Sequence, residues 1–224
     1  MKERPILFQG EMVRALLAGT KTQTRRLVKF PLIDRDALCE LAGNELAGSR
    51  EDTLRNSPYG RPGDRLWVKE TFLPWVNTKD GSFSHVAAFR ADGYELEAGE
   101  QWRPSIFMPR AGARIMLEIV DVRVERLCKI SEEDARAEGG PRILGFKEKG
   151  GRQHGFSSYR DWYRALWDGI NAKPKPIYIR KGVVSHYVSY PWGGEQKLGV
   201  YRGKTVINTV NPCVWVVEFR RVEA

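Results

Sequence analysis

The sequence predicts a mixed α+β fold, a small β-barrel with peripheral helices and an inserted segment. Short segments rich in Val, Ile, Trp and Tyr recur along the chain, and three other segments show helical spacing of apolar residues. Several antiparallel-type strands with few helices favour a barrel over a βαβ fold. The length of 224 residues fits a single domain, residues 1–224, and we expect an insertion at about residues 173–210.

The net charge, the cysteine and histidine spacing and the hydropathy of the chain indicate which partners, cofactors and location to expect. The chain has 37 Lys and Arg against 28 Asp and Glu, and the net charge of +9 favours a polyanionic partner, nucleic acid first. The three cysteines are scattered and the three histidines share no spacing with them, so we predict no metal and no cofactor. The N-terminus lacks a signal-peptide core, and no apolar run approaches about 18 residues. We therefore expect a cytoplasmic protein with no membrane partner.

The N-terminal residues predict a strand and a helix. Residues 5–8 are extended in type, and residues 11–18 place apolar side chains at i, i+3/i+4 spacing. Gly19 follows, where a helix commonly ends with a residue in the left-handed region. Residues 21–26 then carry one lysine, two threonines and two arginines without an apolar side chain. Such a run is either a solvated loop or a site that faces an anionic or polar group.

The middle of the chain predicts further strands at residues 27–30, 65–72 and 85–90. Two prolines and two glycines within residues 58–64 predict a turn before the second of these strands. The polar residues 48–58 are expected to be a loop.

The C-terminal half contains the clearest periodic patterns. Residues 114–127 alternate apolar and polar side chains, as a half-buried strand does. Ser131, followed by three acidic residues, predicts the N-cap of a helix that reaches Glu138. Residues 158–170 have the spacing of an amphipathic helix, and residues 213–222 predict a terminal strand.

The order of these features resembles the ASCH domain family, which implies a PUA-like β-barrel that binds or acts on RNA. The features are a helix followed by Gly-x-Lys-x-x-Thr, Pro-Gly-Asp before a strand, Ile-Ser-Glu-Glu-Asp-Ala, and a strand with Trp-Val-Val-Glu-Phe. The match covers residues 5–30, 58–72, 102–140 and 211–222 in the family's order. It is closest to the larger, often prophage-encoded members.

The resemblance also implies a reaction. Many members have glutamate where this chain has Thr24, but a bacterial branch of N4-acetylcytidine amidohydrolases carries Lys-Thr-x-Thr here and a glutamate that aligns with Glu138. That branch implies amide hydrolysis on an acylated cytidine: Thr24 attacks, Lys21 activates it and Glu138 assists. A threonine hydroxyl needs a neighbouring base, and a lysine serves when burial or nearby arginines lower its pKa. The plainer alternative is a solvated loop at Lys21 and Thr24 and an exposed helix residue at Glu138.

A second interpretation uses the same basic cleft without amide chemistry. Arginines that hold phosphates and aromatic rings that stack on bases suit an RNA-binding protein, or a metal-independent ribonuclease. Trp75 and Trp102 are the better surface candidates among the tryptophans, whereas for Glu70 a salt bridge with an arginine is the simpler account. The partner is thus RNA or a modified nucleoside, and the predicted binding residues are Arg25, Arg26, Tyr59, Arg61, Glu70, Trp102, Arg103 and Arg110.

The role of the insertion stays open. Its tyrosines and basic residues suit an added binding surface or a dimerisation arm, and the sequence decides neither this nor the oligomeric state.

Overall fold

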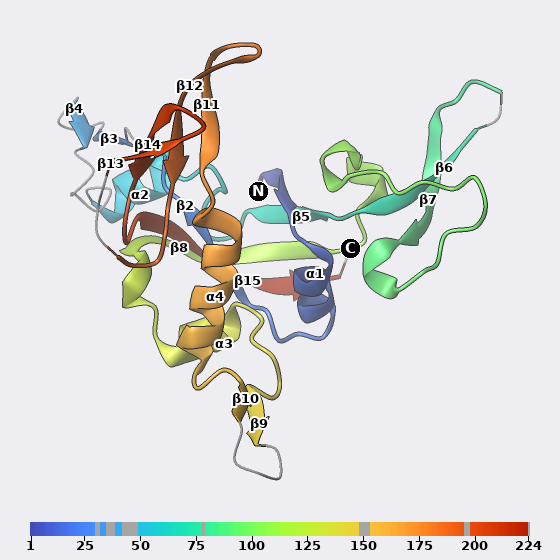
Figure 1. Ribbon diagram of the computed structural model, residues 1–224. Coiled ribbons are helices and arrows are strands. Elements are labelled where there is room, and N and C mark those ends of the chain that lie inside the picture. Colours follow the sequence, from blue (N-terminus) through green and yellow to red (C-terminus); the bar gives the residue numbers. More distant parts are fainter. Residues whose placement is uncertain are drawn as a thin grey trace. The chain divides into compact units, whose positions relative to one another are not determined.

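The mixed α+β class is confirmed by the computed structural model, which describes residues 1–29, 32–34, 39–41, 49–77, 79–147, 153–194 and 198–223 (Figure 1). None of the described helices is long and apolar enough to span a membrane. The helices are α1 (Gly10–Leu17), α2 (Arg50–Asn56), α3 (Glu132–Ala137) and α4 (Tyr159–Asn171). The strands are β1 (Glu3–Leu7), β2 (Gln23–Leu27), β3 (Leu32–Asp34), β4 (Cys39–Leu41), β5 (Arg65–Lys69), β6 (Phe72–Val76), β7 (Phe83–Phe89), β8 (Met116–Arg126), β9 (Gly145–Lys147), β10 (Gln153–Gly155), β11 (Lys175–Arg180), β12 (Val183–Ser189), β13 (Leu198–Tyr201), β14 (Lys204–Asn208) and β15 (Cys213–Val222).

The chain divides into two compact units. Unit 1 comprises Met1–Thr24, Ser49–Arg123 and Val216–Ala224, and unit 2 comprises Arg25–Gly48 and Val124–Trp215. This division does not test the prediction of a single domain, which stays a prediction.

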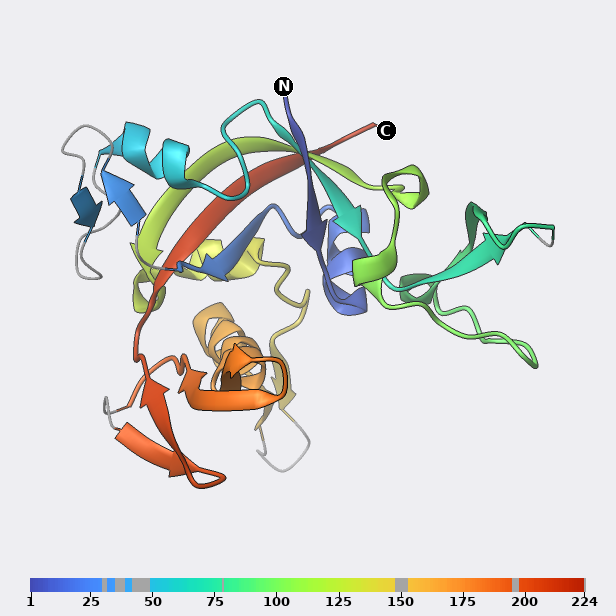
Figure 2. The same cartoon turned by 90° about the horizontal axis from the view of Figure 1, so that it is seen from above.

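The main sheet has five strands in the order β1-β5-β8-β15-β2. In unit 1, β1 pairs with β5 in parallel, with Glu3 opposite Arg65, and β5 pairs with β8 antiparallel (Figure 2). The parallel pair departs from the antiparallel strands that the sequence suggests. In this order β1 and β2 are the edge strands among the described residues, so closure into a barrel stays a prediction.

Helix α1 closely matches the helix expected at residues 11–18. Its apolar spacing buries Val13 and Leu16, which are 0% and 2% exposed. Gly19 follows with φ 71°, the left-handed conformation expected after the last turn. The polar run of residues 21–26 begins two residues after Gly19.

Two predictions about the secondary structure of unit 1 are wrong. The single strand expected at residues 65–72 is two strands, β5 and β6, and β6 pairs with β7 in a hairpin. The loop expected at residues 48–58 contains α2. The Ser49 hydroxyl accepts from the Asp52 N–H, and the Asp52 carboxylate accepts from the Ser49 N–H, which is a capping box.

In unit 2, α3 and α4 lie side by side, and both begin at a serine cap (Figure 1). The Ser131 and Ser158 hydroxyls each accept a hydrogen bond from the third N–H of their helix. Helix α4 buries Tyr163 and Trp167, and the Trp167 indole N–H donates to the Tyr190 carbonyl at 2.8 Å. Both predicted helices are therefore confirmed.

The segment predicted as an insertion forms a sheet of its own. Its strands have the order β11-β12-β14-β13, with β12 and β14 parallel and the other neighbours antiparallel. The terminal strand β15 spans the residues that the sequence predicted.

Candidate active site

The polar run after α1 folds as a strand rather than a loop. The strand runs from Gln23 to Leu27, so it begins earlier than the strand expected at residues 27–30; Val28 and Lys29 lie after it, and residue 30 lies outside the described residues. Lys21 and Thr24 are each 4% exposed, and Gln23 is 2% exposed. The alternative of a solvated loop at Lys21 and Thr24 is therefore wrong, since both residues are buried although the run has no apolar side chain.

Lys21 lies against an apolar wall in unit 1. Its backbone N–H donates to the Ala15 carbonyl at 3.2 Å, and its Nζ lies 5.5 Å from the centroid of the Phe8 ring. Phe8 in turn packs edge-on against Phe219, with 6.3 Å between the centroids. The face of an aromatic ring is electrostatically negative, so it offsets part of the hydration that a buried ammonium group loses.

Thr24 is held by the pairing of the main sheet. The Phe219 N–H of β15 donates to the Thr22 carbonyl at 2.8 Å, which fixes the start of β2 within unit 1. Side chains alternate along a strand, so Thr24 and its neighbours Gln23 and Arg25 point to opposite faces. Thr22 is exposed, whereas Thr24 is buried.

Glu138 ends α3 and is buried as well. Its backbone N–H donates to the Asp134 carbonyl at 3.0 Å, and its residue is 3% exposed. Gly139 follows with φ 96° and turns the chain away from the helix. The alternative of an exposed glutamate near the helix end is therefore wrong.

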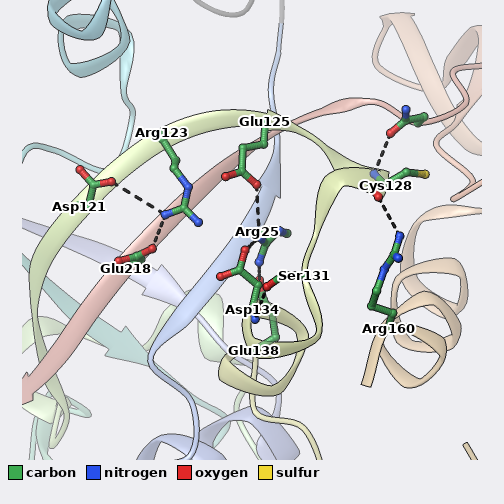
Figure 3. A network of polar contacts seen from close by, with 11 residues as sticks. Arg25, Asp121, Arg123, Glu125, Cys128, Ser131, Asp134, Glu138, Arg160 and Glu218 are labelled. Atoms are coloured by element: carbon green, nitrogen blue, oxygen red, sulfur yellow. Dashed lines mark hydrogen bonds and ion pairs between the residues drawn. The ribbon is translucent and has the colours of Figure 1, made fainter. Parts of the chain in front are cut away.

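A buried arginine joins three carboxylates in unit 2 (Figure 3). The Arg25 side chain is fully buried; its Nη1 donates to Glu138 Oε1 at 3.2 Å and its Nη2 donates to Asp134 Oδ2 at 2.7 Å. Nη2 also lies 3.4 Å from Glu125 Oε2. Strand β2 thus supplies the cation, and β8 and α3 supply the anions. We call these four residues the Arg25 cluster.

Charges of the Arg25 cluster act on the hydroxyl of Tyr163 in α4. Burial raises the pKa of the Tyr163 hydroxyl well above its ordinary value, and the negative charge of Glu138 raises it further. The positive charges of Arg25 and Arg26 oppose this rise. Tyr163 therefore stays a neutral phenol at physiological pH.

The predicted catalytic residues are distributed over both units. Lys21 and Thr24 belong to unit 1, and Glu138 belongs to unit 2 together with Arg25. The expectation that the fold brings Lys21, Thr24 and Glu138 into one site stays a prediction.

The predicted binding residues differ in exposure. Arg61 and Arg103 are exposed, and Arg26 and Tyr59 are half-buried. Trp102 is half-buried with its ring edge-on to Tyr94, 6.2 Å between centroids.

Two more of these residues are held by ion pairs. The exposed Arg110 donates from Nε to Glu3 Oε2 at 2.8 Å. Glu70 is 1% exposed and accepts from Nε and Nη2 of Arg114, both at 2.9 Å. The salt bridge considered from the sequence for Glu70 is thus observed.

Arg114 makes a second fork in unit 1. Its Nη1 and Nη2 donate to the two oxygens of Asp92, each at 2.7 Å, and its guanidinium lies 3.8 Å from the Phe89 ring centroid. Burial raises the pKa of the Glu70 carboxyl, and the hydrogen bonds from Arg114 oppose this in part. We call Glu70, Asp92 and Arg114 the Arg114 cluster.

Sequence reasoning did not assign a site role to several polar residues of β2, β8, α3 and α4. Gln23, Glu125, Asp134 and Tyr163 are among these. Asp134 was visible only as a capping residue, and Glu125 only as a polar position in the alternation of β8. Neither pattern tells that a buried arginine lies across from it.

Among the described residues, no three His, Cys, Asp or Glu side chains are grouped so as to hold a metal ion. Comparison of the chain with models of protein families, with curated proteins and with solved structures found no match.

Proposed function

We propose that this protein is an amidohydrolase that acts on an N4-acylated cytidine or a related modified nucleoside. Thr24 is the nucleophile, Lys21 activates it and Glu138 assists. The observation that carries the proposal is the burial of a lysine and a threonine hydroxyl three residues apart, each 4% exposed. A lysine and a threonine without a catalytic role are normally solvated. Burial lowers the pKa of a lysine amine, so a buried lysine can serve as the base that a threonine nucleophile needs.

The chemistry follows from these groups. Thr24 Oγ1 attacks the amide carbonyl carbon and transfers its proton to the neutral Lys21 amine. The C–N bond then breaks, the Lys21 ammonium passes this proton to the N4 nitrogen with Glu138 assisting the transfer, and cytidine leaves, while the acyl group stays on Thr24 as an ester. Water attacks this ester, with Lys21 again as base, and releases the carboxylic acid and free Thr24.

Glu138 has a defined support in unit 2 for its assisting role. Arg25 donates to one of its oxygens at 3.2 Å, and burial restricts its rotamers. We assign Arg25 to positioning Glu138 rather than to binding phosphate, because its fully buried guanidinium already faces three carboxylates.

The test is chromatographic conversion of N4-acetylcytidine to cytidine by the wild type and by Lys21→Ala and Thr24→Ala. We expect turnover to fall at least about a hundredfold in both variants. Matched controls are Thr22→Ala, an exposed threonine two residues from Thr24, and Lys29→Ala, an exposed lysine after β2. Both controls should keep full turnover. No conversion by the wild type would exclude this substrate.

The role of Glu138 needs a separate measurement. Glu138→Gln is compared with Glu133→Gln, an exposed residue of the same helix. A double-mutant cycle of Lys21→Ala and Glu138→Gln then measures whether the two residues act as a unit, since residues of one catalytic group have strongly non-additive effects. Additive effects would remove Glu138 from the catalytic group while leaving Thr24 and Lys21 in it.

The proposal also includes a PUA-like barrel built on the five-stranded sheet, and a cytoplasmic location. The resemblance to the ASCH family, whose members bind or act on RNA, supports these two points.

A second candidate function is RNA binding or metal-independent RNA cleavage. It is favoured by Trp75, which is 59% exposed and stacks on His85 in the β6–β7 hairpin with 5.9 Å between ring centroids. An exposed stacked pair is a platform for a base. RNA affinity that falls with salt, or shortening of unmodified RNA without added metal, would favour this candidate over nucleoside hydrolysis.

A further inference from the structure

The sheet β11-β12-β14-β13 exposes aliphatic side chains on one face. In its register Leu198 lies opposite Ile207, and Ile207 lies opposite Val188. Residues directly opposite one another share a face, and so do residues two apart along a strand, which adds Val200. Leu198 and Val200 are 78% and 80% exposed, and Ile207 is 39% exposed. We call these residues and Val188 the aliphatic face.

The opposite face of the same sheet is the packed one. Tyr187 and Val206 lie opposite each other there, 8% and 5% exposed. The Tyr201 ring packs edge-on against Tyr187, with 4.9 Å between centroids. A sheet with one packed face normally presents polar side chains on the other. An outer face of Leu, Val and Ile therefore marks an interaction surface.

The segment that forms this sheet is basic. Residues 173–208 contain seven Lys and Arg and one Glu, so this segment carries +6 of the net charge of +9. Lys175 lies opposite Val188 and so ends one row of the aliphatic face. The exposed basic side chains on the described strands and turns of the sheet are Lys175, Arg180, Lys181, Arg202 and Lys204.

We propose that the aliphatic face docks an extended segment of an acidic partner protein. Alternate side chains of the partner segment are apolar and lie beside Leu198 and Val200, and its carboxylates face the lysines and arginines of the sheet. Among the described residues β13 is an edge strand of this sheet, so the partner segment adds alongside it by strand pairing. This inference is independent of the hydrolase proposal, because all of its residues lie in the inserted sheet.

The same observations weigh against two other occupants. A nucleic acid would satisfy the basic rim, but it binds single strands by stacking on aromatic rings, and the exposed members of this face are aliphatic. A second copy of the chain would bring two basic rims together, and like charges across an interface are unfavourable.

The test uses a displayed library of random dodecapeptides, selected on the full-length protein and depleted on a Leu198→Ser/Val200→Ser variant. We expect enriched peptides in which apolar and acidic residues alternate. A synthetic copy of the most enriched peptide should bind the wild type at least about tenfold more tightly than the depleted variant, and more weakly as salt rises.

Two further variants separate the contribution of charge from that of the aliphatic side chains. Lys175→Glu reverses the charge at the end of one row of the aliphatic face, leaves its four aliphatic residues unchanged and should weaken the peptide by a similar factor, so the test does not rest on one variant that fails to fold. Val120→Ser, at a 51% exposed apolar residue of unit 1, should leave binding unchanged. Circular dichroism and thermal unfolding check the fold of every variant.

The remaining outcomes overturn the proposal. Enriched peptides without acidic residues, or binding equal in wild type and Leu198→Ser/Val200→Ser, would contradict it. Binding of an oligouridine of about 20 nucleotides that is lost in this variant, without peptide enrichment, would assign the face to nucleic acid. Self-association by sedimentation that is lost in the variant would assign it to a second copy.

Discussion

The Arg25 cluster and the Arg114 cluster each place an arginine among carboxylates, but they do so differently. Arg114 makes a two-bond fork to Glu70 and another to Asp92. Arg25 spreads single contacts over three carboxylates, Glu125, Asp134 and Glu138, from a side chain that is fully buried.

The two clusters differ in how far water can replace their contacts. Paired forks on a partly exposed guanidinium satisfy donors and acceptors in planar geometry, which is typical of a structural ion pair. The fully buried guanidinium of Arg25 has no water to replace its contacts with three carboxylates, so removal of this cation is costly.

Arg25→Gln should destabilise the protein most, by about 3–5 kcal/mol in the free energy of unfolding, because the buried cation shared by three carboxylates is lost. Urea unfolding followed by circular dichroism measures this. Arg25→Lys keeps the charge but cannot reach all three carboxylates with one ammonium, so its cost should be smaller than that of Arg25→Gln. Equal stability of wild type and Arg25→Gln would show that the Arg25 cluster contributes no net stability.

Arg114→Gln should cost less, about 2–3 kcal/mol, although it leaves the buried Glu70 without its fork. Arg114 is 26% exposed and Asp92 is 45% exposed, so water replaces part of what is lost. The same urea experiment checks this value. A cost above that of Arg25→Gln would reverse the comparison.

Glu70→Gln should stay within about 1 kcal/mol of the wild type, since Arg114 keeps the fork to Asp92. Burial raises the pKa of Glu70 above 4.5, so ionisation of this carboxyl disfavours the folded state. Its favourable contribution is present below pH 4.5 and is lost as pH rises through the folded pKa. The unfolding free energy of Glu70→Gln should therefore increase relative to that of the wild type as pH rises through the folded pKa of Glu70. Parallel pH profiles of the two unfolding free energies would contradict this.

Arg110→Gln should have the smallest effect. The guanidinium of Arg110 holds the pKa of Glu3 below 4.5, so the contribution of Glu3 is present above pH 4.5 and is lost as pH falls through the lower folded pKa. Both side chains are largely solvated, at 45% and 36% exposed, and salt screens their attraction. Thermal unfolding at pH 7 and pH 3 should show a small difference between wild type and variant that vanishes at pH 3.

The sequence predicted the elements whose signals are local. Helix α1, the two helices capped by Ser131 and Ser158, and strand β15 were each expected near their observed bounds. Caps and apolar periodicity act within a few residues, so one sequence contains them. Helix α2 had such a signal too, in the pair Ser49 and Asp52, which the polarity of the segment obscured.

The candidate site was predictable in its residues but not in their surroundings. Lys21, Thr24 and Glu138 came from a motif and its spacing, and their residue types gave no sign of burial. A polar run without apolar side chains looks solvated, because local composition favours water. Strand pairing with β15 buries it instead.

By itself, the sequence determined the α+β class, the positions of most helices, the basic character of residues 173–208 and the lysine–threonine motif. Only the tertiary structure decided that Arg25 faces carboxylates rather than solvent, that Glu70 binds Arg114, and that Leu198 and Val200 stay exposed. Local structure depends on neighbours in the chain. Burial and charge pairing depend on residues more than forty positions away, which only the folded chain brings together.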